Sequence, residues 1–280
     1  MKKILLFFSF IFINISFAME TPVKEIKGSE VWSGDVIIEG IVAVRKGAYL
    51  KIMPGTKVMF IAKDYDGDDI GDGEVYVEGE IECLGTKDAP IIFTVYKDAV
   101  EPAKWKYVMV NHAKKAVFDW TIFEGAYSGL QVHFSTATVK NCVFRKNIDG
   151  FRFSTSNIFV SGCKMTENKH GIRYEERDST GTICGNEITD NEIGIFPVTK
   201  CKGKINFKLN NIYQNGYNIR MGDEQRDDLS FANNYFGSQL EREILKTIYD
   251  RKFDKNLPKV KYKPFLKKAV LLGEEGCLER

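Results

Sequence analysis

The chain has 280 residues, with 40 Lys and Arg against 38 Asp and Glu, and six cysteines. This near balance of charge argues against a nucleic-acid partner, because such affinity depends on neutralising many phosphates. At this length the cysteines cannot define a small disulfide-built scaffold, so an apolar core has to hold the fold.

The N-terminus, residues 1–18, has the pattern of a secretory signal peptide. Lys2 and Lys3 precede an apolar run of about 14 residues, and Ser16 and Ala18 offer small side chains to a signal peptidase. The run is short for a membrane helix, which needs about 20 residues, and an uncleaved anchor is the alternative. Cleavage removes two lysines and no acid, which leaves 38 basic and 38 acidic residues. We therefore expect a periplasmic or extracellular protein with no transmembrane segment after signal cleavage.

After a lead-in (residues 19–30), short segments of alternating apolar residues follow one another from residue 36 to residue 122. Glycines and the Pro54-Gly55 pair separate these segments. Alternation with a period of two is typical of strands with one buried face. Residues 19–237 are therefore predicted to form one all-β unit.

Residues 64–74 form an acidic insertion in this unit. The insertion holds six acidic groups within 11 residues, and these groups repel one another. Ca²⁺ takes about six to eight oxygen ligands on a flexible loop and would relieve this repulsion. The candidate metal ligands are Asp64, Asp66 and Asp68, at alternate-residue spacing, and Asp72 four residues further on.

The spacing of these carboxylates resembles Ca²⁺ loops of the thrombospondin type-3 and EF-hand kind, with two departures. Asp69 stands where a glycine would make the sharp turn, and Val75 stands where the last Glu ligand would be. The resemblance implies a structural Ca²⁺ ion, and the alternative is a loop whose carboxylates are merely solvated.

An Asn-x-x-Gly motif, followed by apolar-x-apolar, recurs along the middle of the chain. Gly150, Gly171, Gly194 and Asn218 hold the same position, at steps of 21, 23 and 24 residues. A repeat of this length, built from short alternating segments, indicates a solenoid. Each unit cannot bury its inner face alone, so the units must stack as a parallel β-coil. The Asn and Gly corners are expected to supply the residues that adopt positive φ, and the Asn side chains are expected to form an internal stack.

The register of the repeat also predicts which residues point outward. In the strand after each corner, the residue between the two apolar ones faces solvent, and on a parallel stack these residues lie in one row about 4.8 Å apart. The row consists of Gln131, Arg152, Arg173, Phe196 and Arg220. Guanidinium–carboxylate contacts and ring stacking would suit an acidic glycan. The alternative is a set of exposed ion pairs with Asp149, Glu175 and Glu176 that bind nothing.

Residues 238–280 are predicted to close the solenoid. Ser238-x-x-Glu241 has the form of a capping box, and apolar residues follow at helical spacing up to Ile248. An open stack leaves unpaired strand edges, so we expect this helix and the tail to cover that end. A surface helix that closes nothing is the alternative. The basic segment from Lys255 to Lys268 offers one further hypothesis, an assembly surface.

The cysteines leave several pairings open. Cys142 and Cys163 occupy the same repeat position, so adjacent coils would hold them at a distance that a disulfide can span. Two free inward thiols are the preferred interpretation there. Cys184 and Cys201 could pair across a loop, and the other two cysteines have no visible partner. No His or Cys spacing indicates a transition-metal site.

Four stretches resemble the right-handed parallel β-helix proteins of the pectin-lyase-like superfamily. They are residues 47–60, residues 77–94, the Asn-x-x-Gly series, and residues 233–266 with Asn233-Asn234-Tyr235-Phe236-Gly237 at their start. The resemblance implies one right-handed parallel β-helix with a C-terminal helix and tail as its cap. The chain is similar to exported members of this superfamily that carry a carbohydrate-binding or sugar-hydrolase label.

The preferred hypothesis is an exported binding or scaffold module that contacts a polysaccharide or an envelope protein through the outward row. The alternative is a Ca²⁺-dependent polysaccharide lyase or glycoside hydrolase, the latter needing carboxylates at a defined separation. The candidate carboxylates do not recur as a pair at one outward position, so no catalytic residue is assigned. His170 is expected to be solvated at a turn. The four carboxylates considered as candidates for catalysis are Asp149, Glu175, Glu176 and Asp190.

Overall fold

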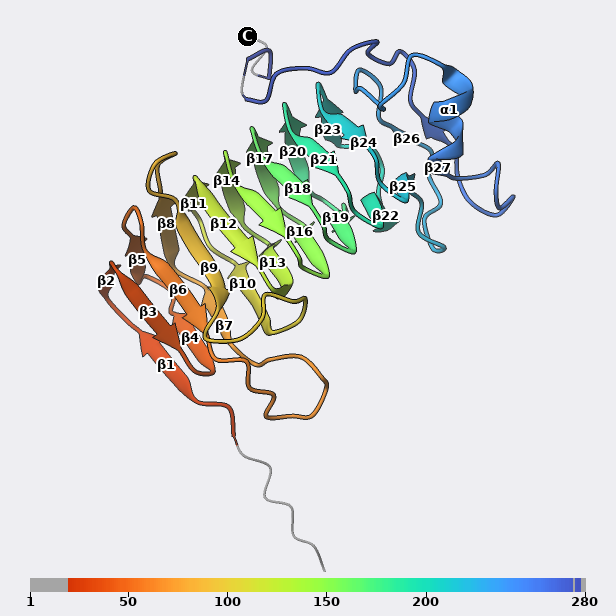
Figure 1. Cartoon of the computed structure of the whole chain (residues 1–280). Coiled ribbons are helices and arrows are strands. Elements are labelled where there is room, and N and C mark those ends of the chain that lie inside the picture. Colours follow the sequence, from red (N-terminus) through yellow and green to blue (C-terminus); the bar gives the residue numbers. More distant parts are fainter. Residues whose placement is uncertain (1–19, 274, 278–280) are drawn as a thin grey trace, which may run out of the picture.

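The computed structural model describes residues 20–273 and 275–277. These residues wind into a solenoid whose main strands collect in three parallel sheets, named A, B and C (Figure 1). Each coil adds one strand to every sheet in turn, because β1, β2 and β3 lie in sheets A, B and C and β4 returns to sheet A. The predicted signal peptide, residues 1–18, lies outside the described residues.

Sheet A carries the predicted outward row and contains 10 strands in the described part of the chain. The strands of sheet A are β1 (Val23–Ile26), β4 (Ile41–Val44), β7 (Glu74–Val77), β10 (Trp105–Asn111), β13 (Ala126–His133), β16 (Asp149–Ser154), β19 (His170–Glu175), β22 (Ile193–Thr199), β25 (Tyr217–Arg220) and β27 (Ile248–Tyr249). The first coil begins at Val23, so residues 19–30, expected as a lead-in, already contain β1 and the start of β2.

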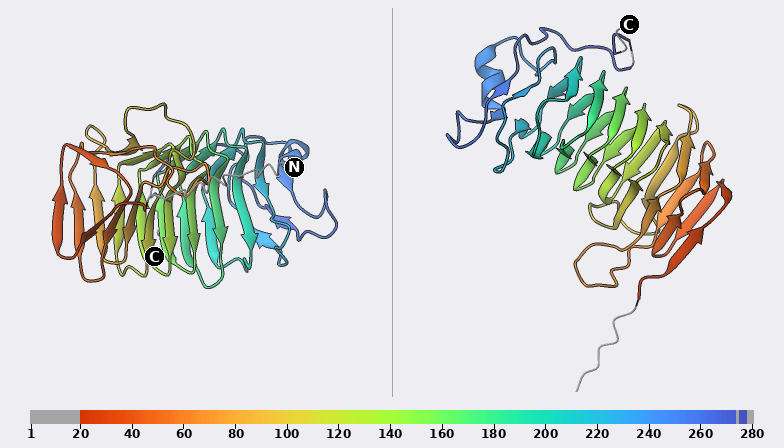
Figure 2. Two further views of the ribbon diagram at one scale, coloured as in Figure 1. Left: turned by 90° about the horizontal axis from the view of Figure 1, so that it is seen from below. Right: turned by 180° about the vertical axis from the view of Figure 1, so that it is seen from behind.

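Sheets B and C close the other two sides of each coil. The strands of sheet B are β2 (Ser29–Trp32), β5 (Tyr49–Ile52), β8 (Glu80–Leu84), β11 (Ala116–Asp119), β14 (Thr136–Lys140), β17 (Asn157–Ser161), β20 (Thr180–Cys184) and β23 (Ile205–Lys208). The strands of sheet C are β3 (Asp35–Ile38), β6 (Lys57–Phe60), β9 (Ile91–Val95), β12 (Thr121–Glu124), β15 (Val143–Arg145), β18 (Lys164–Thr166), β21 (Glu187–Thr189) and β24 (Asn211–Tyr213). Figure 2 shows the strands as near-parallel rows along the stack.

The core is a column of inward side chains to which the strands of all three sheets contribute. Phe93, Phe123 and Phe144 lie on successive coils with ring centroids 5.1 and 5.0 Å apart and nearly parallel planes. Stacking of like residues is the direct result of the repeat, because equivalent positions on adjacent coils are strand partners. Burial of this column is the main source of stability.

An internal Asn ladder stabilises the corners between sheets C and A. The Asn147 amide donates to Asn168 at 3.0 Å, and Asn168 donates to Asn191 at 2.9 Å. The Asn-x-x-Gly motif is therefore structural, but its expected backbone conformation is wrong. Positive φ falls on the residue before each Asn, such as Lys146 at 54°, and not on the Asn or Gly. Gly150 serves close approach instead, since a Cβ there would lie 2.7 Å from the Gly171 carbonyl oxygen.

The C-terminal segment lies at the end of the stack and contains helix α1 (Glu241–Lys246) and a two-strand sheet of β26 (Leu229–Ser230) and β28 (Val260–Lys261) (Figure 1). The predicted capping box is wrong: the N-cap is Leu240, without a side-chain cap, and Glu241 bonds Tyr262 instead. Ile248, expected in the helix, belongs to β27. In the described residues, no helix is long and apolar enough to cross a membrane.

A disulfide joins Cys184 at the end of β20 to Cys277 in the tail. The predicted Cys184–Cys201 pairing is wrong, because Cys201 is a buried free thiol. Cys142 and Cys163 are free and buried on adjacent coils, as preferred from the sequence. The tail before Cys277 follows the solenoid and bonds Asn211 and Gly185 through the backbone of Val270 and Gly273.

Candidate functional site

The row expected from the repeat is present on the outer face of sheet A, but Gln131, expected to face solvent, is 5% exposed because it packs against His133. Gln131, Arg152, Arg173 and Phe196 are successive strand partners on β13, β16, β19 and β22. The residues on either side of each row member are buried in the core, so the strand pleat turns the row outward. Its ligand-binding role stays a prediction.

The row continues through Arg220 to an aromatic residue that the repeat did not predict. Arg220 pairs with Tyr249 of β27, and its guanidinium carbon lies 5.4 Å from the Tyr249 ring and 5.8 Å from the Phe196 ring. Both distances suit cation–π contacts. The rings of Tyr217 and Phe253 each lie 5.3 Å from that of Tyr249.

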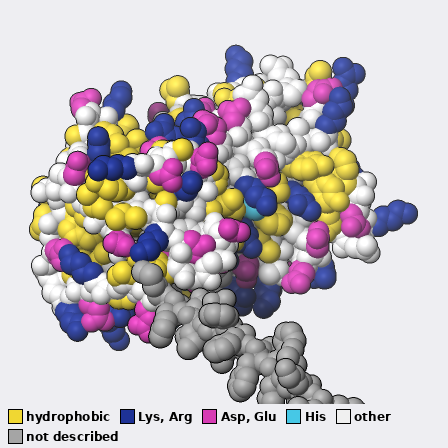
Figure 3. All heavy atoms as spheres, turned by 60° about the horizontal axis from the view of Figure 1, so that its bottom comes forward, with side chains coloured by type: hydrophobic (Ala, Val, Ile, Leu, Met, Phe, Trp, Pro, Cys, Tyr) yellow, Lys and Arg dark blue, Asp and Glu magenta, His cyan; other side chains and the backbone are white. Residues whose placement is uncertain are grey.

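Figure 3 views the side of the molecule on which sheet A lies. Lys and Arg side chains surround a histidine near the middle of this face, and a hydrophobic patch lies to the right. Tyr249 was not predicted because it lies in the segment assigned to the cap. One sequence signal could have placed Tyr249 in the row. An apolar residue, Ile248, precedes it as Ile219 precedes Arg220, and both isoleucines are buried.

A buried carboxylate lies against the two arginines. Asp149, at the start of β16, is 1% exposed, and its Oδ1 lies 2.6 Å from His170 Nδ1. Its Oδ2 accepts a hydrogen bond from Arg173 Nη1 at 3.3 Å and lies 3.9 Å from Arg152 Nη1. The expectation that His170 is solvated is wrong, since it is 9% exposed and its ring stacks on Phe196 with centroids 5.0 Å apart.

Positive charge exceeds negative charge at this cluster. Among the residues described, Asp149 is the one carboxylate within 4.0 Å of either guanidinium. Burial, and then the charge of Arg173, lower the pKa of Arg152 below its ordinary value. Such a shift is the effect expected of a desolvated cation without a full counter-charge.

Gln131 and His133 add polar groups at one end of the row. Gln131 Nε2 lies 3.1 Å from His133 Nε2, and Gln131 Oε1 is buried without a hydrogen-bond partner in the part of the chain that is described. Burial, and then the charge of Arg152, lower the pKa of His133 to about 4. The imidazole is therefore neutral at neutral pH, with one nitrogen as donor and the other as acceptor.

A hollow of about 290 Å³ opens beside the row. Arg152, Arg173, His133 and Glu175 line it, and Glu175 pairs with Arg177 at 2.8 Å. The mixture of three guanidiniums, one of them paired with Glu175, a neutral ring and hydroxyl-bearing neighbours fits an anionic, hydroxylated ligand.

The other candidate carboxylates do not reach this hollow. Glu176 is buried and accepts backbone hydrogen bonds from residues 202–204. Asp190 is exposed at a different corner, between β21 and β22. Asp149 is engaged by His170 and Arg173, so the carboxylate pair that a glycoside hydrolase needs is not assembled in the described hollow.

The acidic insertion brings together three of its four predicted metal ligands. Carboxylate oxygens of Asp64, Asp66 and Asp72 lie within 4.8 Å of one another, while Asp68 is outside this group. Asp64 accepts the backbone N–H groups of Gly67 and Asp69 at 2.6 and 2.9 Å. Asp69 itself adopts φ 66°, a conformation that Asp tolerates, so the missing glycine does not break the turn.

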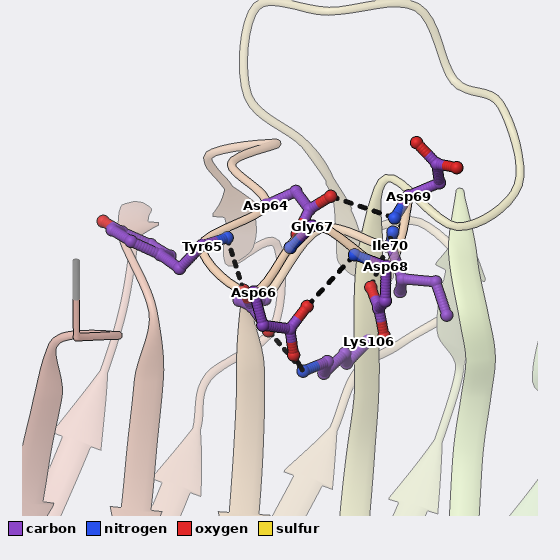
Figure 4. Close-up of polar contacts among 9 residues, drawn as sticks. Asp64, Tyr65, Asp66, Gly67, Asp68, Asp69, Ile70 and Lys106 are labelled. Carbon is purple, nitrogen blue, oxygen red and sulfur yellow. Dashed lines mark hydrogen bonds and ion pairs between the residues drawn. The ribbon is translucent and has the colours of Figure 1, made fainter. Parts of the chain in front are cut away.

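A lysine from β10 enters the same acidic cluster. The Lys106 ammonium lies 3.4 Å from Asp66 Oδ2 (Figure 4). It also pairs with buried Asp72. Burial opposes the charge of Lys106, but the hydrogen bond and charge of Asp72 raise its pKa overall. If Ca²⁺ binds, Asp64, Asp66 and Asp72 would hold it in competition with Lys106. Three converging carboxylates fit part of the Ca²⁺ shell, and calcium stays a prediction.

The comparison with protein families matches the geometry of the coils. A family model described as "Right handed beta helix region" matches residues 97–236. The chain belongs to this right-handed β-helix family. The matched span contains the whole outward row from Gln131 to Arg220, and the family establishes the fold, not an activity. Comparison with curated proteins and with solved structures found no match.

Proposed function

We propose that this β-helix protein is exported and binds an acidic polysaccharide along the row from Gln131 to Arg220. The observation that carries the proposal is the excess of positive charge at Arg152 and Arg173, which share Asp149. A guanidinium that is partly removed from water gains free energy when an anion completes its hydrogen bonds. Ligand carboxylates supply that charge through paired, charge-assisted contacts.

The arrangement of the row favours a polymer over a small anion. Neighbouring members are one strand apart, about 4.8 Å, and Arg residues alternate with rings from Arg173 through Phe196 and Arg220 to Tyr249. A chain that repeats acidic groups and apolar ring faces contacts several members at once. Linked contacts of this kind raise overall affinity well above that of each contact alone.

Export has two independent supports. The first 18 residues have a signal-peptide pattern, and Cys184 is bonded to Cys277. Disulfides persist mainly in oxidising compartments, which favours a periplasmic or extracellular location.

Binding is favoured over catalysis by the state of the carboxylates beside the hollow. Asp149 and Glu175 are both paired with arginines, and neither stands free to accept a proton from a substrate. A Ca²⁺-dependent lyase remains the competing function, and it would release unsaturated sugars that absorb ultraviolet light. Incubation with pectate and alginate that yields no such product supports the binding function, and product formation lost in Arg173→Ala overturns it.

The direct experiment is a binding titration against pectate, alginate and hyaluronan, with neutral dextran as a negative control. We expect binding to at least one acidic polymer and none to dextran. Arg152→Gln is the cleanest variant, because Asp149 keeps its closer contacts to His170 and Arg173. Loss of one charge-assisted contact should weaken binding about tenfold or more.

Arg242→Gln is the matched control, since Arg242 is an exposed arginine on α1 and is not a member of the row. It should bind like the unaltered protein. Equal affinity of Arg152→Gln and the unaltered protein, or equal binding to dextran and acidic polymers, contradicts the proposal. Capture of an envelope protein without any polysaccharide binding would replace the glycan with a protein partner.

A further inference from the structure

Phe134 is an exposed aromatic ring at the corner between sheets A and B. It is 55% exposed and has φ 48°, a left-handed conformation that is unusual for a bulky residue. The same corner holds His112, Thr155, Arg177 and Lys200 on other coils, with φ between 48° and 60°. The backbone conformation is therefore a property of the corner and does not require a ring. The fold accounts for the turn but not for the exposed aromatic side chain.

Phe134 stands between two hollows. On one side it lines the hollow of about 290 Å³ that holds Arg152 and Arg173. On the other side it lines a larger hollow of about 690 Å³ that continues over the corner. Arg177 also lines both hollows, so Phe134 and Arg177 together form the boundary between them.

The two hollows differ in charge. The first is dominated by the two arginines of the row. The second has nearly balanced charge together with two threonines. Its lining includes Arg177, Lys200, Lys202 and Arg226 against Asp178, Glu224 and Asp227. Closely spaced donors and acceptors suit hydroxyl groups better than a second carboxylate.

The ring of Phe134 packs against His112, the equivalent corner residue of the preceding coil. The rings of His112 and Phe134 pack edge to face, with centroids 4.7 Å apart and planes at 81°. Such a contact positions an exposed ring while leaving most of its surface free. The free surface offers an apolar platform next to polar hollows, the combination that a sugar ring with one apolar face requires.

We propose that Phe134 stacks on a sugar ring of the polysaccharide as the chain passes from the Arg152–Arg173 pair over the corner into the larger hollow. This larger hollow is a second subsite, which takes a hydroxyl-rich sugar and does not require a carboxylate. The inference rests on the proposed binding function. It adds the path that the polysaccharide takes and the dependence of affinity on the length of the fragment.

The test measures affinity for fragments of pectate, alginate and hyaluronan of increasing length, from disaccharides upward. In the unaltered protein, affinity should rise with length once a fragment spans both hollows. Phe134→Ala should remove that rise, with a loss of about fivefold to tenfold for long fragments and no change for the shortest ones that bind. Phe134→Tyr should keep the rise, because it preserves the ring face.

Leu240→Ala provides the matched control, since Leu240 is 53% exposed but lies at the C-terminal end of the stack. It should leave the length dependence intact. Equal binding of long fragments by Phe134→Ala and the unaltered protein overturns the second subsite, and so does an equal loss for short and long fragments.

Failure of this inference can be separated from failure of the proposed function. If Arg152→Gln weakens the binding of all fragments and Phe134→Ala weakens the binding of none, the row binds the polysaccharide but the polysaccharide does not cross the corner. If Arg152→Gln changes nothing, the row itself is not the binding site, and both proposals fall.

Discussion

The acidic insertion and the arginine row both concentrate like charges, but they resolve the repulsion differently. In the insertion, Asp64 accepts backbone N–H groups and Lys106 supplies a cation to Asp66 and Asp72. In the row, two guanidiniums share one carboxylate. Lys106 and the backbone offset only part of the charge of the three converging carboxylates, but two of these, Asp64 and Asp66, are exposed to water. The side chains of Arg152 and Arg173 are only 23% exposed, and a desolvated charge gains most from an outside counter-ion, so the row is the stronger ligand candidate although the insertion is richer in charge.

The largest expected effect comes from removing the one carboxylate of the row cluster. Asp149→Asn leaves the guanidiniums of Arg152 and Arg173 without their counter-charge in a largely buried place. We expect the free energy of unfolding to fall by about 3 kcal/mol, measured by urea unfolding. Asp178→Asn is the control, since its side chain is 86% exposed. A change below about 1 kcal/mol in Asp149→Asn would show that the row needs no internal counter-charge.

Removing the cation of the insertion should have a smaller effect. Lys106→Met leaves buried Asp72 with only the Tyr65 N–H, and the free energy of unfolding should fall by about 1–2 kcal/mol without calcium. Calcium should then raise the melting temperature of Lys106→Met more than that of the unaltered protein, because its competitor is gone. Lys87→Met, at an exposed corner, is the control. No calcium response in either protein would remove the metal prediction.

The two regions should also lose stability in different pH ranges. The pKa of His133 is lowered to about 4 in the folded state, so the unfolded chain binds the proton more readily. Stability present above the ordinary pKa of about 6.5 should be lost as the pH falls toward 4. Hydrogen bonds from the backbone N–H of Gly67 and Asp69 lower the pKa of Asp64, so its contribution is lost only below its ordinary value of 3.8.

His133→Gln isolates the row in this pH experiment. Unfolding by urea at about pH 7.5 and about pH 5, on either side of the ordinary histidine pKa, should differ less in His133→Gln than in the unaltered protein. An NMR titration of the ring gives the second measurement. A His133 that titrates near its ordinary pKa would contradict the burial on which the expectation depends.

The smallest expected effect is that of Asp68→Asn, compared with Asp66→Asn in the same insertion. Asp68 is outside the converging group, and its Oδ1 accepts the N–H of Ile70, which an amide oxygen also does. Asp68→Asn should change the free energy of unfolding by less than about 0.5 kcal/mol and should leave any calcium response intact. Asp66→Asn should reduce that response. Equal effects of the two variants would mean that the unbound geometry does not represent the ligand set.

The sequence predicted what the repeat controls and missed what lies outside it. Equivalent positions on adjacent coils become strand partners, so the period alone aligns Arg152 with Arg173. The period also aligns Asp149 with His170, but it does not predict that the two side chains are buried in contact, because the direction of a turn side chain depends on its neighbours. Cys277 and Tyr249 follow the last complete repeat, so no spacing rule connects them to Cys184 or Arg220. Asn tolerates positive φ, which is why the corners were expected to use it there, but the ladder uses the Asn amides instead.

The disulfide-linked tail changes how this solenoid can come apart. Stacked coils contact only their neighbours, so an unbraced stack unzips from either end, one coil at a time. The tail runs back along the stack, bonded first to Asn211, then to Gly185, and fixed to Cys184 by Cys277. Fraying of the coils beyond Cys184 therefore requires the tail to be released from the solenoid as well. The oxidised protein should unzip from the coil that starts at Val23, which places the arginine row in the part of the molecule that opens last.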